Sequence, residues 1–432
     1  MIKQFLQKAL QKLLGRTVSS DSVVIPRKAH GISRQQISHN AMKVLYRLHR
    51  ANKKAYLVGG SVRDLLLGRE PKDYDVATDA KPEEVRKLFR NCRLIGRRFR
   101  LAHVHFHREI IEVATFRAHS QQPLKEQHHS GMILRDNVYG TVEEDALRRD
   151  FTINALYYDI ANFSVVDFTG QGIKDLNAGL IRIIGEPAQR YKEDPIRMLR
   201  AIRFAAKLGF TIEPQSEKPI SELASLLQAV PKARLFDELT KIFSCGNSES
   251  AFVLLHQQGL LETLFPEVND CLNGENHQQV HQFLLHVFRN TDHRMNDDKP
   301  ITPAFILAAL MWYPLLSKQC ALQAQGESFH PALEQALNTT INSHTQQLAI
   351  PRRFLTFIRE VWMLQSRLEK RHPKQVIRLL HHRRFRAAYD FLLLRAQSGE
   401  PCQKEAHWWT QFIQGNKEER RNKLDDRRHK TS

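Results

Sequence analysis

The stretch Tyr56–Gly68, Y-L-V-G-G-S-V-R-D-L-L-L-G, decides the fold of this chain together with K-D-Y-D-V-A at Lys72–Ala77. The pattern predicts a short apolar strand at 55–58, a turn at Gly59–Gly60, and a helix that ends at the next glycine. Such a turn brings backbone N–H groups and the positive end of the helix dipole to one place. The sequence therefore predicts an anion site at the glycine pair, where Arg63, one turn into the helix, could add a charge-assisted bond.

Two acids, Asp73 and Asp75, stand two positions apart at a strand expected over 74–77. In a strand, side chains at i and i+2 share a face, so these carboxylates could converge on one hard cation. Mg²⁺ prefers such sparse carboxylate ligation, completed by phosphates and water, and a pair of ions can activate a hydroxyl and stabilise a leaving pyrophosphate. A third acid is then expected, and Glu112, in the predicted strand I-I-E-V-A-T-F, is one candidate.

A third pattern is R-R-D-F-T-I-N-A-L, from Arg148 to Leu156. Arg148 and Arg149 suit contacts with a triphosphate or a ribose. Asp150 could bond sugar hydroxyls or support the metal site, so it remains a second candidate for the third acid beside Glu112.

A fourth pattern is E-D-P-I-R-M-L-R, from Glu193 to Arg200. Asp194, placed before a proline, is a natural N-cap, so the helix that follows needs no functional explanation. Arg197 and Arg200 lie a turn apart on one face of that helix. Asp194 and Arg197 together offer an acceptor and a donor that suit the edge of a nucleobase.

Composition indicates a polyanionic partner. Across 432 residues, 65 Lys and Arg outnumber 46 Asp and Glu, giving a net charge of +19, which favours nucleic acid. The length predicts two or three domains. Five scattered cysteines without a C-x-x-C motif fit a reducing cytosol, so a cytoplasmic location is expected. The longest apolar run, 304–313, predicts a core helix that is too short to span a membrane.

The order of predicted elements indicates an α+β chain: a mixed, five-stranded head followed by an elongated all-α neck and body. The five head strands are expected at 55–58, 74–77, 92–95, 101–106 and 109–116. The predicted segments are an amphipathic extension and linker (1–35), a mixed α/β head (36–186), a helical neck (187–270), a second helical domain (271–415) and a charged tail (416–432). Residues 1–16 have helical amphipathic spacing and could dock on the protein, on a partner or on an anionic membrane surface.

Taken in order and at this spacing, the four patterns resemble the class II nucleotidyltransferases of the DNA polymerase β superfamily, which comprise bacterial poly(A) polymerases and CCA-adding tRNA nucleotidyltransferases. The resemblance is strong over about 55–210 and weaker through the helical half. It implies that the head is catalytic and that the domain at 271–415 binds RNA. It implies that Asp73 and Asp75 hold Mg²⁺, with Glu112 or Asp150 as the third acid. It also implies that nucleotide is bound by a set of residues from all four patterns: Gly59, Gly60, Arg63, Arg148, Arg149, Asp194, Arg197 and Arg200.

Within that family, L-I-G-R-R-F-R-L-A-H-V at 94–104 and R-F-R-A-A-Y-D-F-L-L-L-R-A at 384–396 are similar to bacterial poly(A) polymerases. The resemblance therefore implies template-independent transfer of AMP from ATP to RNA 3′ ends, acting on RNA and not DNA, by a monomer, and promoting RNA decay. A CCA-adding or A-adding tRNA enzyme is the first alternative, and a non-catalytic RNA-binding protein is the second. One departure from the family is the short C-terminal tail of mixed charge.

Weaker patterns receive structural interpretations. The alternating His103, His105 and His107 would share a strand face, and solvated or RNA-facing histidines are favoured over a zinc site. Trp408–Trp409 favours helix packing over base stacking. The basic run 371–386 fits an RNA-contacting helix and a solvated helix face equally well. The sequence contains no His-Asp dipeptide, the mark of the metal phosphohydrolase domain that some CCA enzymes carry, so that second activity is not expected.

Overall fold

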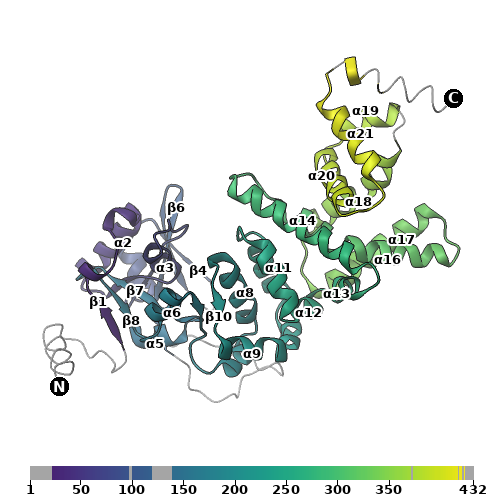
Figure 1. Cartoon of the computed structure of the whole chain (residues 1–432). Helices are drawn as coiled ribbons and strands as arrows, with labels where there is room; N and C mark the ends of the chain where they lie inside the picture. Colours follow the sequence, from purple (N-terminus) through teal and green to yellow (C-terminus); the bar gives the residue numbers. More distant parts are fainter. Residues whose placement is uncertain are drawn as a thin grey trace. The chain divides into compact units, whose positions relative to one another are not determined.

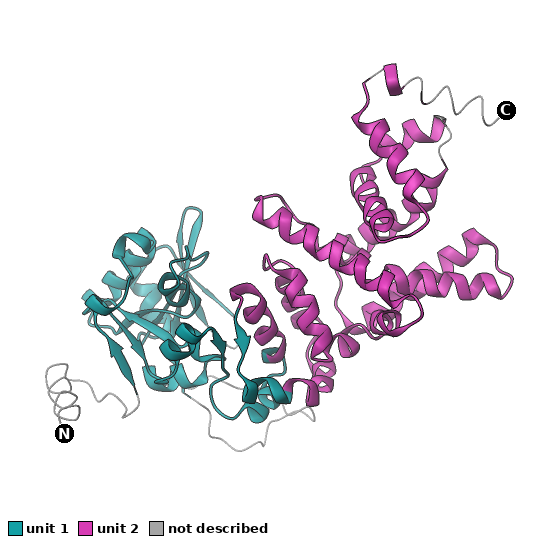
Figure 2. Cartoon of the chain, viewed as in Figure 1, with its two compact units in different colours: residues 1–197, 210–219 teal, residues 198–209, 220–432 magenta. Residues whose placement is uncertain are grey.

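A computed structural model describes residues 22–96, 100–118, 139–370, 373–416, 418–420 and 423. The chain divides into two compact units (Figure 2). Unit 1 comprises residues 1–197 and 210–219, and unit 2 comprises 198–209 and 220–432. The amphipathic segment 1–16, the predicted loop 119–136 and most of the charged tail lie outside the described residues. The boundaries between the five predicted segments remain a prediction.

Unit 1 contains a mixed sheet of eight strands in the order β1-β8-β7-β2-β3-β6-β5-β4 (Figure 1). All neighbouring strands are antiparallel except β3 and β6, which are parallel. The strands are β1 (Val23–Ile25), β2 (Ala55–Val58), β3 (Asp75–Thr78), β4 (Cys92–Ile95), β5 (Leu101–Phe106), β6 (Glu109–Thr115), β7 (Leu156–Asp159) and β8 (Ser164–Asp167).

The α+β class is confirmed, and all five predicted strands are present, but the sheet has three more. β1 lies in the predicted linker and β7 and β8 follow the R-R-D pattern. β7 and β8 are buried at every position, so they lack the apolar–polar alternation by which a half-exposed strand is recognised. β1 has only three residues and exists because it pairs with β8.

Local sequence signals explain the helices that cover the sheet. Ser38 caps α2 (His39–Arg50) by accepting hydrogen bonds from two first-turn N–H groups. Proline at the first position starts α4 (Pro82–Leu88). The shorter helices of this unit are α3 (Gly60–Leu66), α5 (Val142–Arg148), α6 (Gly172–Ala178) and α7 (Pro187–Glu193), and a small parallel pair joins β9 (Leu180–Ile181) to β10 (Thr211–Ile212).

The helix α5 packs on one face of the sheet. This face presents Tyr56, Val58 and Tyr157, and these side chains pack with Val142 and Ala146 of α5 in one buried cluster. Intervening residues such as Leu57 point to the opposite face, because side chains alternate along a strand. Since Asp75 has the same parity as buried Ala77, it belongs to the α5 face.

Unit 2 consists of helices among the described residues, apart from the turns that connect them. α8 (Ile196–Leu208) begins in unit 1 and ends in unit 2. The others are α9 (Pro214–Glu222), α10 (Lys232–Ile242), α11 (Ser248–Gln257), α12 (Leu260–Leu264), α13 (Pro266–Asn273), α14 (His277–Asn296), α15 (Pro303–Leu310), α16 (Trp312–Ala324), α17 (Phe329–Gln347), α18 (Arg352–Glu369), α19 (Pro373–Leu380), α20 (Phe385–Gln397) and α21 (Gln403–Gln414), with α9 mostly in unit 1.

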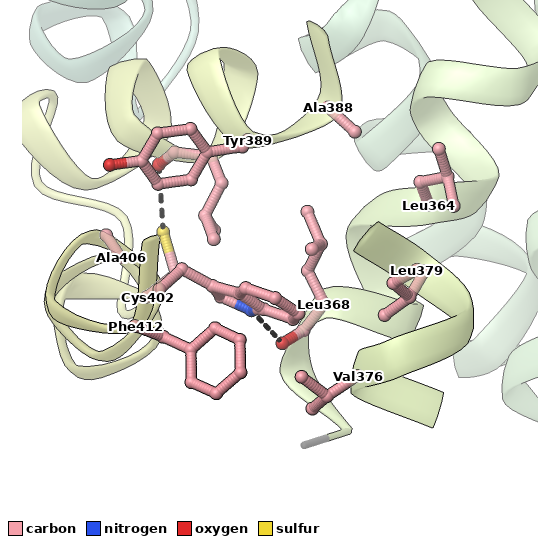
Figure 3. Close-up of a cluster of buried hydrophobic side chains, with 11 residues drawn as sticks. Leu364, Leu368, Val376, Leu379, Ala388, Tyr389, Cys402, Ala406 and Phe412 are labelled. Carbon is pink, nitrogen blue, oxygen red and sulfur yellow. Dashed lines mark hydrogen bonds between the residues drawn. The ribbon is translucent and has the colours of Figure 1, made fainter. Parts of the chain in front are cut away.

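The last four helices share one hydrophobic core (Figure 3). Trp409 is fully buried and donates its indole N–H to the backbone oxygen of Leu368 at 2.9 Å, while Trp408 stacks on Phe412. The packing interpretation of the tryptophan pair is therefore confirmed. The basic run 371–386 is not one helix, because α19 ends at Leu380 and α20 begins at Phe385.

The predicted core helix at 304–313 is divided between α15 and the start of α16, and almost all of its residues are buried. Among the described residues no single helix is long and apolar enough to cross a membrane, although α15 and α16, bent by 40°, pass that test of length and composition as a pair.

Candidate active site

The pairing of three strands places acidic and basic side chains in one row. Glu112 of β6 lies opposite Asp75 of β3, and His103 of β5 lies opposite Glu112. Residues paired in register point to the same face, so these three side chains share the α5 face of the sheet. The His103 Nε2 and a Glu112 carboxylate oxygen are 3.5 Å apart.

Asp73 lies outside the strand that was expected to present both acids on one face, since β3 begins at Asp75. The sequence argument from strand spacing therefore applies to only one of the two acids. His107 likewise follows β5 and has a positive φ of 47°, so only His103 and His105 share that strand.

The surroundings of Asp75 disfavour its charged form. Loss of water around the carboxylate raises the pKa of Asp75 to about 6, even though the residue keeps an exposed face. The like charge of Glu112 raises this pKa next, and Asp73 adds to it, while Arg149 acts in the opposite direction. Asp73, Asp75 and Glu112 therefore form an anionic group that a bound cation would stabilise.

The turn after β2 has the geometry that the sequence predicts. Gly59 has φ 72° and ψ −133°, a conformation that residues with a side chain rarely adopt, and it precedes α3 directly. A Cβ at this position would also lie 3.1 Å from a guanidinium nitrogen of Arg149. Because Val58 pairs with Asp75, the turn lies at the same end of the sheet as the carboxylates.

Arg63 is buried and held by two neighbours. Its guanidinium donates to Asp64 at 2.7 and 2.8 Å and to the side-chain oxygen of Asn154 at 2.6 Å. With 2% of its surface exposed, it supports the turn from inside the protein.

Arg149 is fixed toward the carboxylates by two residues that sequence reasoning missed, Asp145 and Tyr157. Its Nε donates to the Tyr157 hydroxyl at 2.8 Å, and this hydroxyl donates to Asp145 at 2.7 Å. Burial acts to lower the pKa of Arg149, but Tyr157 and Asp145 outweigh it and raise the pKa. The acidic E-E-D before the two arginines was the available signal for Asp145.

A cluster of guanidinium groups surrounds Arg148. Burial lowers the pKa of Arg148 to about 10, and the next causes are the positive charges of Arg117, Arg190, Arg197 and Arg149. Such a concentration of like charge is costly in the absence of an anion. The cluster therefore has the charge needed to bind a polyphosphate.

The α7–α8 junction holds part of this cluster in place. Arg190 donates to the backbone oxygens of Arg148 and Arg149, both at 2.8 Å, and to Glu193 at 2.8 Å. Arg197 donates to the Arg190 backbone oxygen at 2.7 Å and to Glu193 at 3.2 Å. Asp194 ends α7, and its backbone oxygen accepts from the Arg197 N–H at 3.0 Å. Arg190 and Glu193 were not predicted as site residues.

Asp150 and Arg200 lie in different settings from the other predicted residues. The Asp150 carboxylate accepts hydrogen bonds from the Phe151 N–H at 2.8 Å and from the Asn154 amide at 3.2 Å, so it organises its own turn. Arg200 lies on the part of α8 that belongs to unit 2, where its guanidinium is 5.4 Å from the Phe204 ring centre.

The donor set fits Mg²⁺. Among the described residues no group of three or more His, Cys, Asp or Glu side chains is arranged to hold a metal ion by itself. Mg²⁺ does not need one, since it is usually held by one or two carboxylates together with substrate phosphates and water. Asp75 and the two acids that raise its pKa, Glu112 and Asp73, carry the hard oxygen atoms that such an ion prefers. The adjacent arginines carry the positive charge that phosphates would contact.

A mixed sheet that brings carboxylates, a glycine turn and several arginines to one end is an arrangement suited to the transfer of a nucleotide. Three family models match the chain: the poly A polymerase head domain over 55–182, a probable RNA and SrmB-binding site of polymerase A over 209–272, and the polymerase A arginine-rich C-terminus over 325–432. The chain is 50% identical to poly(A) polymerase I of Escherichia coli O6:H1 over 397 residues, 90% of this chain and 85% of that protein. The chain belongs to the poly(A) polymerase family.

More distant relatives share the fold. A CC-adding tRNA nucleotidyltransferase of Halalkalibacterium halodurans is 41% identical over 207 residues, 48% of this chain and 49% of that protein. The structure of a Bacillus stearothermophilus CCA-adding enzyme in complex with CTP has a TM-score of 0.58 at 24% identity and covers 86% of this chain and 81% of that one. The common architecture extends along most of the chain.

Proposed function

We propose that this poly(A) polymerase extends RNA 3′ ends by transferring AMP from ATP, with Asp73 and Asp75 holding Mg²⁺ and Glu112 as the third acid beside them. The 3′-hydroxyl of RNA gives its proton to water, its oxygen forms a bond to the α-phosphorus of ATP, the bond from that phosphorus to the oxygen shared with the β-phosphate breaks, and pyrophosphate leaves. The observation that carries the proposal is the position of Arg149, which belongs to the arginine cluster and also lowers the pKa of Asp75.

Glu112 is preferred to Asp150 as the third acid. Glu112 is paired with Asp75 and its charge raises the pKa of Asp75, whereas Asp150 bonds its own turn. When bound, Mg²⁺ would supply a lower pKa for the attacking hydroxyl and charge compensation for the leaving pyrophosphate.

The arginines bind and orient the triphosphate. Arg149 carries charge beside the Gly59–Gly60 turn, whose backbone N–H groups can approach phosphate closely, and Arg148 adds charge within the same arginine cluster. Arg63 acts as a positioning residue, because its bond to Asn154 connects the turn to the loop that bears Asp150. Little covalent work remains for the protein, and catalysis depends on orientation and charge neutralisation.

Base selection is assigned to the start of α8. Asp194 accepts from, and Arg197 donates to, the edge of the adenine. Glu193 fixes the Arg197 guanidinium, and a fixed donor distinguishes bases better than a mobile one.

A CCA-adding or A-adding tRNA activity is the alternative. The poly(A) polymerase relative covers 90% of the chain whereas the CC-adding relative covers 48%, which supports polyadenylation. We further propose a cytoplasmic monomer that acts on RNA and not DNA, with residues 1–16 as a contact for protein or an anionic membrane, and with tails that promote RNA decay.

The test supplies the purified chain with either a non-tRNA oligoribonucleotide or a tRNA that lacks its terminus, together with each single nucleotide and Mg²⁺. Long A tracts on the oligoribonucleotide are expected. Incorporation of CMP confined to the tRNA would overturn the proposal. An Asp73→Ala/Asp75→Ala variant that still binds RNA but makes no tail would exclude a purely RNA-binding role for the wild type.

A further inference from the structure

Unit 2 contains a cavity of about 500 Å³ far along the chain from the carboxylates and the arginine cluster. It is lined by residues of α14, α15, α18 and α20 and by the turns before α15 and α20. α18 and α20 also contribute to the hydrophobic core of the last four helices (Figure 3), so these two walls are firmly supported. The volume lies in the range of sites that hold a small organic ligand.

The cavity combines an apolar interior with a cationic lining. Phe305, Phe357 and Ile301 supply aromatic and aliphatic surface. Five cations line it, against two carboxylates: the cations are Arg294, Lys299, Arg383, Arg384 and Arg386, and the carboxylates are Asp297 and Asp390. A pocket for an apolar ligand would not need this charge.

The arginines before and within α20 are held in place but not fully neutralised. Arg383 and Arg384 both donate to the single carboxylate of Glu360, which leaves one positive charge in excess at this point. The Arg384 guanidinium also lies 4.7 Å from the ring centre of Phe357, which fixes its plane. Arg386 pairs with Asp390 at 3.0 Å, but its side chain is 75% exposed, so this pair is weak.

Polar groups that could contact a base edge complete the lining. Asn290 of α14 and Gln397 of α20 present side-chain amides. Thr302 precedes α15 without capping it, so its hydroxyl is not used for the first turn of that helix. These groups can donate and accept, as a nucleobase requires.

We propose that this cavity binds a nucleotide of single-stranded RNA, with the base between the apolar walls and the phosphates on the arginines. A single strand is specified because its bases are unstacked and can enter a pocket, whereas a base in a duplex would first have to be flipped out. RNA is preferred to a free nucleotide because the side chains of Arg383 and Arg386 are 65% and 75% exposed, so they can contact phosphates that continue outside the cavity. The site would hold the RNA independently of the reacting 3′ end.

The experiment measures binding of a fluorescent oligo(A) to the full chain as a function of salt. Arg383→Ala/Arg386→Ala removes two phosphate contacts, and Ala387→Trp fills the cavity without a change in charge. Arg378→Ala is the matched control, because it removes an exposed arginine of α19 that does not line the cavity. Melting curves and single-adenylate addition at saturating primer establish that each variant folds and retains its catalytic site.

The double variant is expected to weaken oligo(A) binding about 5- to 10-fold and to reduce the log–log salt slope by about 1.4, since each single-strand phosphate contributes about 0.7. Ala387→Trp is expected to weaken binding about 10-fold with an unchanged salt slope. Arg378→Ala should have less than half the effect of the double variant. Photocrosslinking with 4-thiouridine should label peptides that contain Phe305 or Phe357.

Three outcomes would overturn the proposal. Wild-type binding by both cavity variants would show that RNA does not enter. If Arg378→Ala weakened oligo(A) binding as much as the double variant, the effect would be one of overall positive charge and not of the cavity. The third outcome combines two results: free AMP or ATP competes for the crosslinked site at micromolar concentration, and the variants do not change the affinity for oligo(A). That outcome would assign the cavity to a free nucleotide instead.

Discussion

Glu112 lies directly opposite Asp75 in the one parallel pairing of the head sheet, and its charge raises the pKa of Asp75. Two acids that are 37 positions apart in sequence thereby come to share one face of the sheet. Asp150, the other candidate, accepts hydrogen bonds from its own turn.

This relationship predicts which acid completes the metal site. Glu112→Gln should lower kcat on the order of 10²-fold or more, because a carboxylate ligand is lost, while Asp150→Asn should cost less. Steady-state adenylation kinetics check this prediction. Glu109→Gln, on the same strand but with the opposite parity, serves as the control and should be near wild type. A larger loss in Asp150→Asn than in Glu112→Gln would reverse the assignment.

The arginine cluster predicts a variant that is weaker in binding but not in stability. Arg148→Gln should raise the KM for ATP about 10-fold, because a charge that we propose contacts the triphosphate is removed. Its melting temperature should be unchanged or higher, because repulsion from Arg117 and Arg190 is relieved. A loss of stability without a change in KM would instead indicate that Arg148 is structural.

Base selection should depend on the junction between α7 and α8. Asp194→Ala should reduce the preference for ATP over CTP by about 10- to 100-fold, since one well-placed polar contact to a base is worth about 1–3 kcal/mol. Competition between labelled nucleotides measures the ratio directly. Lys192→Ala, an exposed change on α7, is the control. An unchanged ratio in Asp194→Ala would remove this residue from base recognition.

A buried ion pair in unit 2 provides a stability prediction. Arg395 donates to Glu400 at 2.7 Å, and the other Glu400 oxygen accepts the Trp312 indole N–H at 2.9 Å. Glu400→Gln should cost about 3 kcal/mol, because the buried guanidinium loses its nearer counter-ion and keeps only the longer pair with Glu369 at 3.7 Å. Glu249→Gln breaks the exposed pair with Arg289 and should cost less than about 1 kcal/mol. Urea unfolding distinguishes the two variants.

His344 predicts acid sensitivity of the same unit. Burial lowers the pKa of His344 below its ordinary 6.5, although the nearby Glu267 acts in the opposite direction. The unfolded chain therefore takes up the proton first as pH falls, and folding becomes less favourable below pH 6.5. The loss between pH 7.5 and 5.5 should be up to about 1.4 kcal/mol.

His344→Gln should abolish this part of the pH dependence, as measured by urea unfolding at the two pH values. The variant keeps a side-chain donor for the Thr340 backbone oxygen, which His344 contacts at 2.9 Å. If wild type and variant respond to pH in the same way, His344 is not the group responsible.

Much of the head could be predicted from local patterns. The glycine turn, the five expected strands and the proline and serine starts of helices depend on residues that are close in sequence, so their spacing reveals them. β1, β7 and β8 could not be found in this way, because complete burial or a length of three residues removes the alternation. The basic run at 371–386 was misleading because its charge suggested one face of a single helix. In the structure the chain turns between Leu380, where α19 ends, and Phe385, where α20 begins.

By itself the sequence determined the residue types and their order: the glycine pair, Asp73 and Asp75, the paired arginines and the Asp194–Arg197 step. Only the tertiary structure decided their relations. It placed Glu112 opposite Asp75 and formed the hydrogen bond between Arg63 and Asn154. It also fixed the Arg149 guanidinium through hydrogen bonds that involve Tyr157 and Asp145. The physical reason is that strand register and buried hydrogen bonds join residues that are far apart in the chain, and local spacing carries no information about such partners.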